Sequence, residues 1–414
     1  MRYPSSLNLN NAYYILLYVL LFTMPFSASS KNLEIKAWAN KETKKSLSSN
    51  LNQFNLLNDT AGLGISKSYN NITSKIMVNL GHKQELTFDQ SFIEYKRKNN
   101  IYGIGKINRI WSFSPNTSLI LSSNARPASS IYFLNGSSKK SKNFFLSWLG
   151  PWSFEAFNSV LSNSNNTNDP MMTGLRVVIE PTNNFKFELV KTSQWAGKGY
   201  KKDFSAFKAA IISNSNEYNH SNINQMAGFG FSYLLNENKI PIRSYAQFVG
   251  EDEAGNLPSC YISLVGSELT FPRSNFFKKL GFEYVDTRVD TSTNGNCGPN
   301  TAYNNSVYDY TNYGSSLAAS IDSEGKSYEA WVSTRISEKT YIKYSIKNLT
   351  VNDANWSNHR LNNYKQKEWI ANIVGSWILK SQKINGRITY QGLSLNEANM
   401  KNGLSFSLDI EHKF

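Results

Sequence analysis

Apolar and polar residues alternate in short runs along most of this chain, a pattern that predicts β-strands rather than helices. The alternation is regular in KFELV (186–190) and ITYQGL (388–393). In the last run, LSFSLDIEHKF (404–414), it places one set of residues on a single side: Leu404, Phe406, Leu408, Ile410, His412 and Phe414. Eighteen strand-like segments are predicted, at about 61–68, 73–80, 89–96, 101–106, 128–134, 142–150, 152–160, 171–180, 184–193, 225–235, 240–249, 258–269, 279–287, 326–335, 339–349, 366–378, 383–391 and 403–414.

The connections between these segments alternate in length. Short ones are expected at 150–151, 181–184, 236–239, 337–339 and 381–382, and long ones at 161–170, 194–224, 288–325, 351–365 and 392–402. Long loops at one end and short turns at the other are typical of an outer-membrane barrel. We therefore predict an all-β fold, a transmembrane antiparallel β-barrel of about 18 strands with long extracellular loops and short periplasmic turns. A soluble β-sandwich or propeller is the alternative, but no blade-length repeat is visible.

Aromatic residues at many strand ends and a terminal Phe414 agree with a barrel in lipid. Only closure lets strands meet lipid without unpaired backbone groups. The barrel is expected over 61–414, preceded by a polar periplasmic arm at 30–60 without strands. Residues 107–127 are too long for a turn; we expect them on the short-turn side, folded against or into the barrel mouth. A short helix with an Asp203 cap is expected at 203–212.

The N-terminus has the pattern of a secretory signal peptide, residues 1–29. Arg2 precedes the apolar run AYYILLYVLLFTMPF (12–26), and small residues follow, with cleavage expected after Ser29. A transmembrane anchor is the alternative, but the run is shorter than the roughly 20 residues that a helical span needs. The expected location is the cell outer membrane, reached through a cleaved signal peptide.

Composition adds charge and cysteine to this picture. The 414-residue chain carries a formal net charge of +14 and two cysteines, Cys260 and Cys297. In an oxidising compartment these could form a disulfide, and two buried thiols are the alternative. With four histidines and no Cys-x-x-Cys, a zinc site is not expected, and neither a metal nor a cofactor is predicted. Nucleic acid is not an expected partner of an exported barrel, and no pattern specifies an oligomeric state.

Five short sequence motifs in the chain resemble motifs of one protein family, and they occur in the same order and at similar spacing as in that family. They are LILSSNARP (119–127), LSWLGPW (146–152), QWAGKG (194–199), GEDEAGNLPS (250–259) and EYVDTR (283–288). They resemble the Wzi family of capsule assembly outer-membrane proteins. The resemblance implies an 18-stranded barrel that attaches capsular polysaccharide to the cell surface, with lectin-like binding and no known catalysis. The chain departs from the family in its short N-terminal arm, and in IWSFSPNTSLI (110–120) where members often have a Trp-Gly-Pro-Gly word.

Three adjacent acids, Glu251, Asp252 and Glu253, are expected at a solvated hairpin tip. In extended backbone Glu251 and Glu253 point one way and Asp252 the other. They could pair with lysines and arginines, accept hydrogen bonds from sugar hydroxyls, or bind Ca²⁺. Glycoside hydrolysis needs a desolvated acid in a cleft, which a solvated tip does not supply. We interpret the acids first as an electrostatic tie across a basic outer surface.

Basic and aromatic loop residues indicate an acidic polysaccharide partner. Two lysine clusters are expected on outer loops, one of Lys139, Lys140 and Lys142 and one of Lys198, Lys201, Lys202 and Lys208. They could attract polysaccharide, bind lipopolysaccharide phosphates, or remain solvated. Aromatic candidates for sugar stacking are Trp195, Tyr200, Tyr303, Tyr308, Tyr310, Tyr313 and Trp356. The candidate polysaccharide-binding residues are Arg126, Trp195, Lys198, Lys201, Lys202, Glu251, Asp252, Glu253, Asp286 and Arg288.

The function that these features favour is binding of capsular polysaccharide and help in assembling or anchoring the capsule. An anion-favouring porin is the first alternative, because of the basic excess. An outer-membrane hydrolase is the second. No Gly-x-Ser-x-Gly word occurs, and the histidines are scattered, at His82, His220, His359 and His412. We therefore expect no enzymatic activity.

Overall fold

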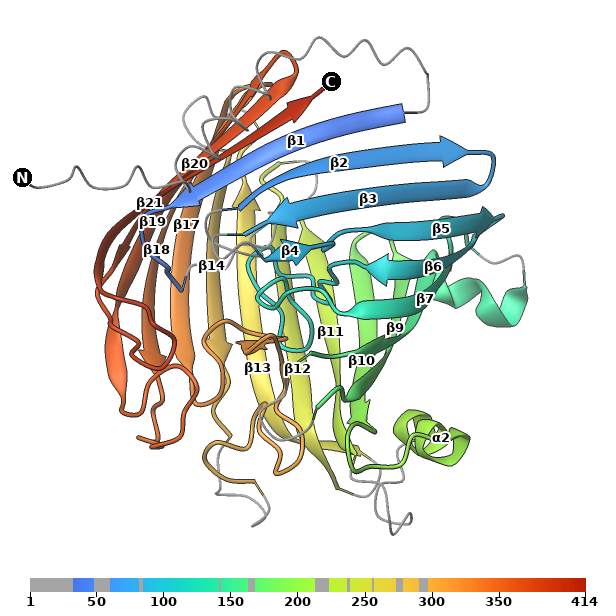
Figure 1. Cartoon of the computed structure of the whole chain (residues 1–414). Helices are drawn as coiled ribbons and strands as arrows, with labels where there is room; N and C mark the ends of the chain where they lie inside the picture. The colour runs from blue at the N-terminus through green and yellow to red at the C-terminus, as the bar shows by residue number, and fades with distance from the viewer. Residues whose placement is uncertain are drawn as a thin grey trace, which may run out of the picture.

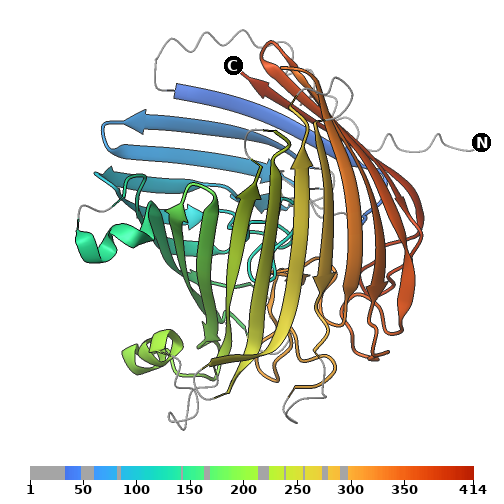
Figure 2. The same cartoon turned by 180° about the vertical axis from the view of Figure 1, so that it is seen from behind.

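The computed structural model of the chain describes residues 33–47, 60–81, 85–140, 143–162, 168–212, 223–236, 239–254, 257–272, 278–289 and 297–414. These residues form a large antiparallel β-barrel, seen from opposite sides in Figures 1 and 2. The expected signal peptide, 1–29, lies outside the described residues and stays a prediction.

The described wall consists of eighteen strands that follow one another in chain order. They are β1 (Leu33–Glu42), β2 (Thr60–Tyr69), β3 (Ile72–Leu80), β5 (Phe92–Arg97), β6 (Asn100–Lys106), β7 (Ser129–Ser137), β8 (Trp152–Val160), β9 (Met171–Thr182), β10 (Phe185–Trp195), β11 (Asn224–Leu235), β12 (Ile242–Ala254), β13 (Leu257–Thr270), β14 (Lys279–Asp286), β17 (Lys326–Ser337), β18 (Thr340–Val351), β19 (Gln366–Leu379), β20 (Gln382–Gln391) and β21 (Gly403–Lys413). Pairing of β1 with β21, from Lys36↔Lys413 to Glu42↔Ser407, closes the barrel. The predicted fold class is confirmed.

Three short strands complete the described set. β4 (Leu86–Thr87) pairs with the end of β3, and β15 (Thr311–Asn312) with β16 (Ser315–Ser316) forms a small hairpin in a loop.

Alternation along the strands separates an apolar outer face from a polar inner face. In β21, Leu404, Phe406 and Leu408 leave 53%, 50% and 43% of their surface exposed, whereas Ser405 and Asp409 are buried. Outward apolar side chains suit contact with lipid, and each described wall strand is paired on both sides, so its backbone groups are satisfied.

The number of strands was predicted correctly through two offsetting errors. Residues 33–42, expected in a strandless arm, form β1, because three of its four charged residues, Glu34, Lys36 and Glu42, face inward; Lys36 pairs with Glu411 at 2.9 Å and with Glu34 at 3.1 Å. Residues 142–150, expected as a strand, contain the 3₁₀ helix η1 (Phe144–Leu149). Its apolar run lacks the period of two that a wall strand requires. The rest of the expected arm, 48–59, lies outside the described residues.

Because of these two errors, the connections between β1 and η1 were assigned to the wrong ends of the barrel. Figure 1 shows the C-terminus at the upper end of the barrel and the helix α2 (Phe204–Ile212) at the lower end, where the long loops lie. Because η1 adds no strand, the connection between β6 and β7 belongs to the long-loop end rather than the short-turn end. By the same correction, Lys139 and Lys140 lie between β7 and β8 at the short-turn end and not on an outer loop. Lys142 lies outside the described residues.

Residues 107–127, here called the luminal segment, fold into the barrel, as expected, although from the other end. The wall residue Gln247 accepts a hydrogen bond from Leu119 N at 2.8 Å and donates one to Trp111 O at 2.5 Å. Arg243 Nη1 donates to Phe113 O at 2.6 Å. Leu119 and Trp111 are completely buried in the main apolar cluster. The segment therefore fills the lumen rather than covering its edge.

Residues 297–325, here called the roof, pack on the luminal segment from the long-loop end. Tyr303 OH donates to Leu119 O at 3.0 Å, and Tyr310 OH donates to Ile120 O at 2.8 Å. Both tyrosines are buried. Their rings stack on each other with centroids 5.8 Å apart, which joins the roof and the luminal segment into one core.

The predicted short helix is confirmed as α2. Asp203 Oδ1 accepts a hydrogen bond from Ala206 N at 2.8 Å, the expected N-cap. In the part of the chain that the structure describes, no helix is long and apolar enough to cross a membrane.

Candidate functional site

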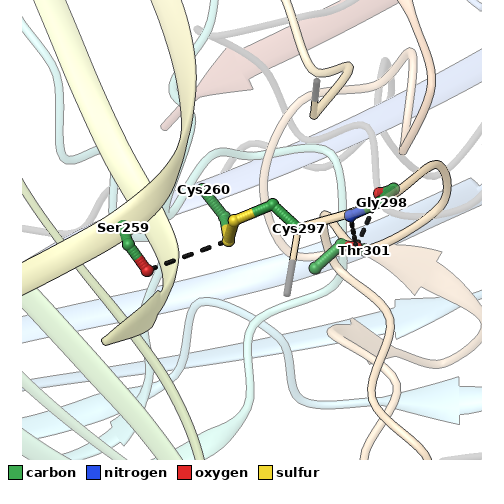
Figure 3. Close-up of a disulfide and its surroundings, with 5 residues drawn as sticks. All are labelled: Ser259, Cys260, Cys297, Gly298 and Thr301. Carbon is green, nitrogen blue, oxygen red and sulfur yellow. Dashed lines mark hydrogen bonds between the residues drawn. A yellow bond between two sulfur atoms is a disulfide. The ribbon is translucent and has the colours of Figure 1, made fainter. Parts of the chain in front are cut away.

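A disulfide ties the roof to the barrel wall. Figure 3 shows Cys260, on β13, joined to Cys297, with Cα atoms 5.4 Å apart. Just beyond it, Gly298 N donates to Thr301 Oγ1 at 3.1 Å, and Thr301 Oγ1 donates to Gly298 O at 2.6 Å. The predicted pairing is confirmed. By chain entropy, a loop of this length corresponds to about 3–4 kcal/mol of stabilisation.

Arg360 is the centre of an ionic network between the roof and residues 352–365, here called the platform loop. Its guanidinium donates to both carboxylate oxygens of Asp322, the Nε bond measuring 2.8 Å. It also donates to Tyr303 O at 3.2 Å and lies 3.7 Å from the carboxylate of Asp309. Burial raises the pKa of Asp322, but the charge and hydrogen bonds of Arg360, with smaller contributions from His359 and Ser323 N, together hold that pKa below its ordinary value.

A second chain of charges links β14 to the platform loop. Arg288 pairs with Asp286 at 2.7 Å and with Asp353 at 2.8 Å, and Asp353 pairs with Lys365 at 2.6 Å. Lys365 is the main cause of the lowered pKa of Asp353, with Arg288 adding to it against burial. The structure thus brings the two candidates Asp286 and Arg288 together, in an internal pair.

Glu251 differs from the expected solvated tip. β12 continues to Ala254, so Glu251 lies within the wall and is only 7% exposed. Burial lowers the pKa of Arg360, but Asp322, Asp309 and Glu251 together raise it above its ordinary value. Glu251 is thus electrostatically coupled to Arg360 of the platform loop. The side chains of the other two acids, Asp252 and Glu253, lie outside what the structure describes.

Arg126 and Trp195 are also committed to internal contacts. Arg126 donates to Asp89 at 2.7 Å, and its guanidinium lies 4.0 Å from the ring centre of Tyr313. Trp195, 3% exposed, donates from Nε1 to Thr173 at 2.9 Å. Among the other aromatic candidates, Tyr303, Tyr308 and Tyr310 are completely or almost completely buried. These residues shape the outer end but present no open ring face to a ligand.

The platform loop carries exposed aromatic rings. Trp356 is 44% exposed and Tyr364, which the sequence analysis missed, is 48% exposed. Asn352 fixes the backbone of Trp356 on both sides: its Oδ1 accepts from Trp356 N at 2.7 Å, and its Nδ2 donates to Trp356 O at 2.8 Å. The exposed residues between and beside the rings are polar or small: Ala354, Asn355, Ser357, Asn358, Asn363 and Lys365. The signal available in the sequence was this run of asparagines around Tyr364.

The lysines Lys198, Lys201 and Lys202 are exposed on the connection between β10 and α2. Lys208 is exposed on α2 itself. The structure therefore confirms that this second predicted cluster lies on an outer loop.

Comparison with known families decides the relationship. The family model described as capsule assembly protein Wzi matches residues 30–406. The chain belongs to the Wzi family. A Klebsiella pneumoniae relative, an uncharacterized 55.8 kDa protein in the cps region, is 27% identical over 172 residues. That match covers 41% of this chain and 34% of the relative, so it spans about a third of the relative's length.

Solved structures share the fold. Escherichia coli Wzi, described as an outer-membrane protein involved in group 1 capsule assembly and a carbohydrate-binding β-barrel, matches with a TM-score of 0.79 at 19% identity. The match covers 100% of this chain and 90% of that one. OprD from Pseudomonas aeruginosa matches with a TM-score of 0.54 at 9% identity, covering 94% of this chain and 96% of that one. At these identities the structures establish a common barrel fold.

In this Wzi-family chain, His359 uses both ring nitrogens, one within the platform loop and one to the roof. Its Nδ1 accepts from Leu361 N at 3.2 Å, which places the proton on Nε2, and Nε2 donates to Ser323 O at 2.9 Å. Neither nitrogen is left to take a proton from a substrate. Of the other loop and turn histidines, His82 and His220 lie outside the described residues. Across the described ranges, no cluster of three His, Cys, Asp or Glu side chains could hold a metal ion.

Proposed function

We propose that this protein binds capsular polysaccharide at the long-loop end of its outer-membrane barrel and helps to assemble or anchor the capsule at the cell surface. Membership of the Wzi family supports this, as does the carbohydrate binding attributed to the E. coli relative of the same fold. We further propose that the chain reaches the outer membrane through a cleaved signal peptide and acts without catalysis.

The rigid platform loop is the observation that carries the proposal. Trp356 and Tyr364 offer ring faces that can stack against the C–H face of a sugar, and the neighbouring amides can bind its hydroxyls. Asn352 fixes Trp356 within the loop, and His359 and Arg360 hold the loop against the roof. A loop fixed before binding loses little conformational entropy when the ligand arrives.

Charge supports an acidic sugar. The chain has a net charge of +14, and Lys365 and Lys198 are exposed at the long-loop end. Positive charge there would raise the local concentration of an anionic polymer, in a salt-sensitive way. Arg126, Trp195, Glu251, Asp286 and Arg288 would act indirectly, by holding the loops in place.

The alternative functions lack a comparable observation. A porin needs a water-filled passage, and here the luminal segment and the roof fill the described lumen with a packed core. A hydrolase would need a positioned base, and His359 has no free nitrogen for that role.

The test removes the two rings and keeps the barrel. We expect the double variant W356A/Y364A to lose capsular polysaccharide from the cell surface, with binding of purified polysaccharide about 2- to 10-fold weaker for each ring. Trp148 on η1, 61% exposed near the short-turn end, supplies the matched control W148A, which should retain capsule normally. Equal retention by both variants would remove the platform loop from the binding site.

A further inference from the structure

The helix α2 lies against the outside of the barrel wall. In β10, the inward side chains include Glu188, which pairs with Arg176, while Leu189 faces outward with 52% exposure. Because side chains alternate along a strand, Lys191, Ser193 and Trp195 share the outward side with Leu189. Figures 1 and 2 both show α2 to the side of the wall, at the long-loop end.

These same outward residues hold α2. Lys191 Nζ donates to Ile211 O at 2.9 Å, and Ser193 Oγ donates to Ala210 O at 2.6 Å. The ring of Trp195 packs on Phe207, with centroids 5.6 Å apart. Lys191 is the next outward residue after the lipid-facing Leu189. The carboxyl end of α2 is therefore one outward step from the apolar band.

The free face of α2 has the composition of a helix at a membrane surface. Its small residues Ala206, Ala209 and Ala210 are buried against the wall. The opposite face exposes Phe204 by 78% and Ile212 by 60%, with the exposed cation Lys208 between them at helical spacing. Lys201 and Lys202, just before the helix, are also exposed. Large apolar side chains beside lysines are costly in water but suit the boundary between headgroups and acyl chains.

An aromatic cluster on the neighbouring strands marks the same boundary. Phe229 on β11 faces outward, and its ring centre lies 5.5 Å from that of Phe248 on β12 and 6.5 Å from that of Tyr261 on β13. Tyr261 leaves 45% of its surface exposed. Belts of aromatic residues stand where barrel walls pass from acyl chains to headgroups.

We propose that α2 is an interfacial helix that binds anionic lipid of the outer leaflet. Phe204 and Ile212 enter the acyl boundary, and Lys201, Lys202 and Lys208 contact phosphate on the headgroups. This site is distinct from the platform loop and does not depend on polysaccharide binding. It assigns to lipid the lysines that the sequence analysis offered to polysaccharide.

Depth labelling tests the position of α2. The two native cysteines are joined in the disulfide, so F204C supplies a single free thiol for a fluorophore in the full-length protein. In phosphatidylcholine vesicles containing diphosphoryl lipid A, the label should be quenched by nitroxide placed near the headgroup and protected from aqueous iodide. The matched control S306C, at an exposed residue of the roof, should show the reverse. Equal iodide quenching at both positions would overturn the proposal.

Lipid retention tests the lysines. In detergent, K201Q/K202Q/K208Q should retain diphosphoryl lipid A roughly tenfold to a hundredfold more weakly than the parent protein, since each cation near an anionic surface contributes appreciably. The control K98Q/K339Q/K380Q removes three exposed lysines near the short-turn end and should retain lipid A normally. Unchanged retention by the first variant, or loss of polysaccharide binding with lipid A retained, would show that these lysines do not serve lipid.

Discussion

At the scale of single residues, the long-loop end depends on a few buried charges whose partners are far away in the sequence. Arg360 lies 38 residues from its partner Asp322 and 57 from Tyr303. Both members of the Arg360–Asp322 pair are mostly withdrawn from water, with side chains 14% and 3% exposed. A buried pair adds little by its presence, but removing one partner leaves an uncompensated charge.

The first prediction concerns that pair. We expect R360M to destabilise the roof by about 3–5 kcal/mol, because the Asp322 carboxylate stays buried without its cation. The wall strands are untouched, so the barrel should still assemble. Limited proteolysis should cut residues 297–325 faster than in the parent protein. R335M, at an exposed arginine, should leave the cleavage rate unchanged, and the double variant D322N/R360M should be cut more slowly than R360M alone. Equal cleavage of R360M and the parent protein would contradict this role.

The second prediction concerns pH. The pKa values of Asp322 and Asp353 are both lowered in the folded protein. At Asp322 burial is the largest cause and raises the pKa, but Arg360 and smaller contributions together lower it further; at Asp353 the hydrogen bond from Lys365 is the largest cause and lowers the pKa. A carboxylate with a lowered pKa stabilises the fold above its unfolded value and loses that effect as pH falls through the folded value. The roof and platform loop should therefore loosen as pH falls below 3.8, the ordinary value for aspartate. Hydrogen exchange of residues 297–325, corrected for intrinsic rate, measures this, and D322N should show a smaller pH step.

Residue-level expectations succeeded where the chemistry was local. The cap of α2 by Asp203 followed from residue type and spacing, and the disulfide from the presence of two cysteines in a chain expected to be exported. Trp356 was a candidate, and it is exposed. By contrast, Trp195 is buried because α2 folds back onto the outer wall, and Glu251 is buried in a wall strand that continues past the expected hairpin tip. Such tertiary contacts leave no periodic signal in the chain.

At the scale of elements, the errors at β1 and η1 have one cause. A strand in a lipid-facing barrel is recognised by alternation, and the inner face tolerates charge because its charges pair across the lumen. Glu34 and Lys36 made β1 resemble a polar arm, although they form such a pair. The apolar run of η1 resembled a strand, although it does not alternate. When both assignments are corrected, the luminal segment begins at the long-loop end, from which it enters the barrel.

The third prediction concerns the disulfide as an anchor between two elements. C260S/C297S should lower the midpoint temperature of thermal unfolding of the barrel. The chain entropy sets an upper limit of about 3–4 kcal/mol on the accompanying loss of unfolding free energy. The loss should be smaller than this limit, because Arg360 and the roof tyrosines still hold the same loop. Heat-dependent migration on a detergent gel gives the midpoint. A reducing agent should lower the midpoint of the parent protein by the same amount and should not change the midpoint of the double variant. A double variant with the same midpoint as the unreduced parent protein would argue against an anchoring role.

At the scale of the whole molecule, the barrel is built as a solid surface rather than a passage. Its inner wall offers polar groups, and the luminal segment uses them: Gln247 and Arg243 each bond its backbone. Lys343 on β18, four wall strands away from β12, donates to Asn116 of the segment at 2.7 Å. A small cavity of about 50 Å³ remains beside that contact, lined in part by Glu329, Lys347 and Arg387. These contacts from β12 and β18 fix the segment within the lumen, and the roof then packs on it.

This architecture leads to the last prediction, which separates a binding barrel from a channel. Reconstituted in planar bilayers, the parent protein should show no steady ion conductance, because the packed luminal segment blocks the passage. Q247A/R243A removes three hydrogen bonds to the backbone of that segment, each contributing about 0.5–1.5 kcal/mol or more for the charged donor. The weakened segment should leave the lumen part of the time and produce brief conducting bursts. N385A removes a lumen-facing amide that bonds Asp409 on the neighbouring strand, and it should stay silent. Steady conductance of the parent protein would favour the channel after all, whereas silence of Q247A/R243A would mean that the remaining contacts, among them those of Lys343, Tyr303 and Tyr310, are enough to hold the segment.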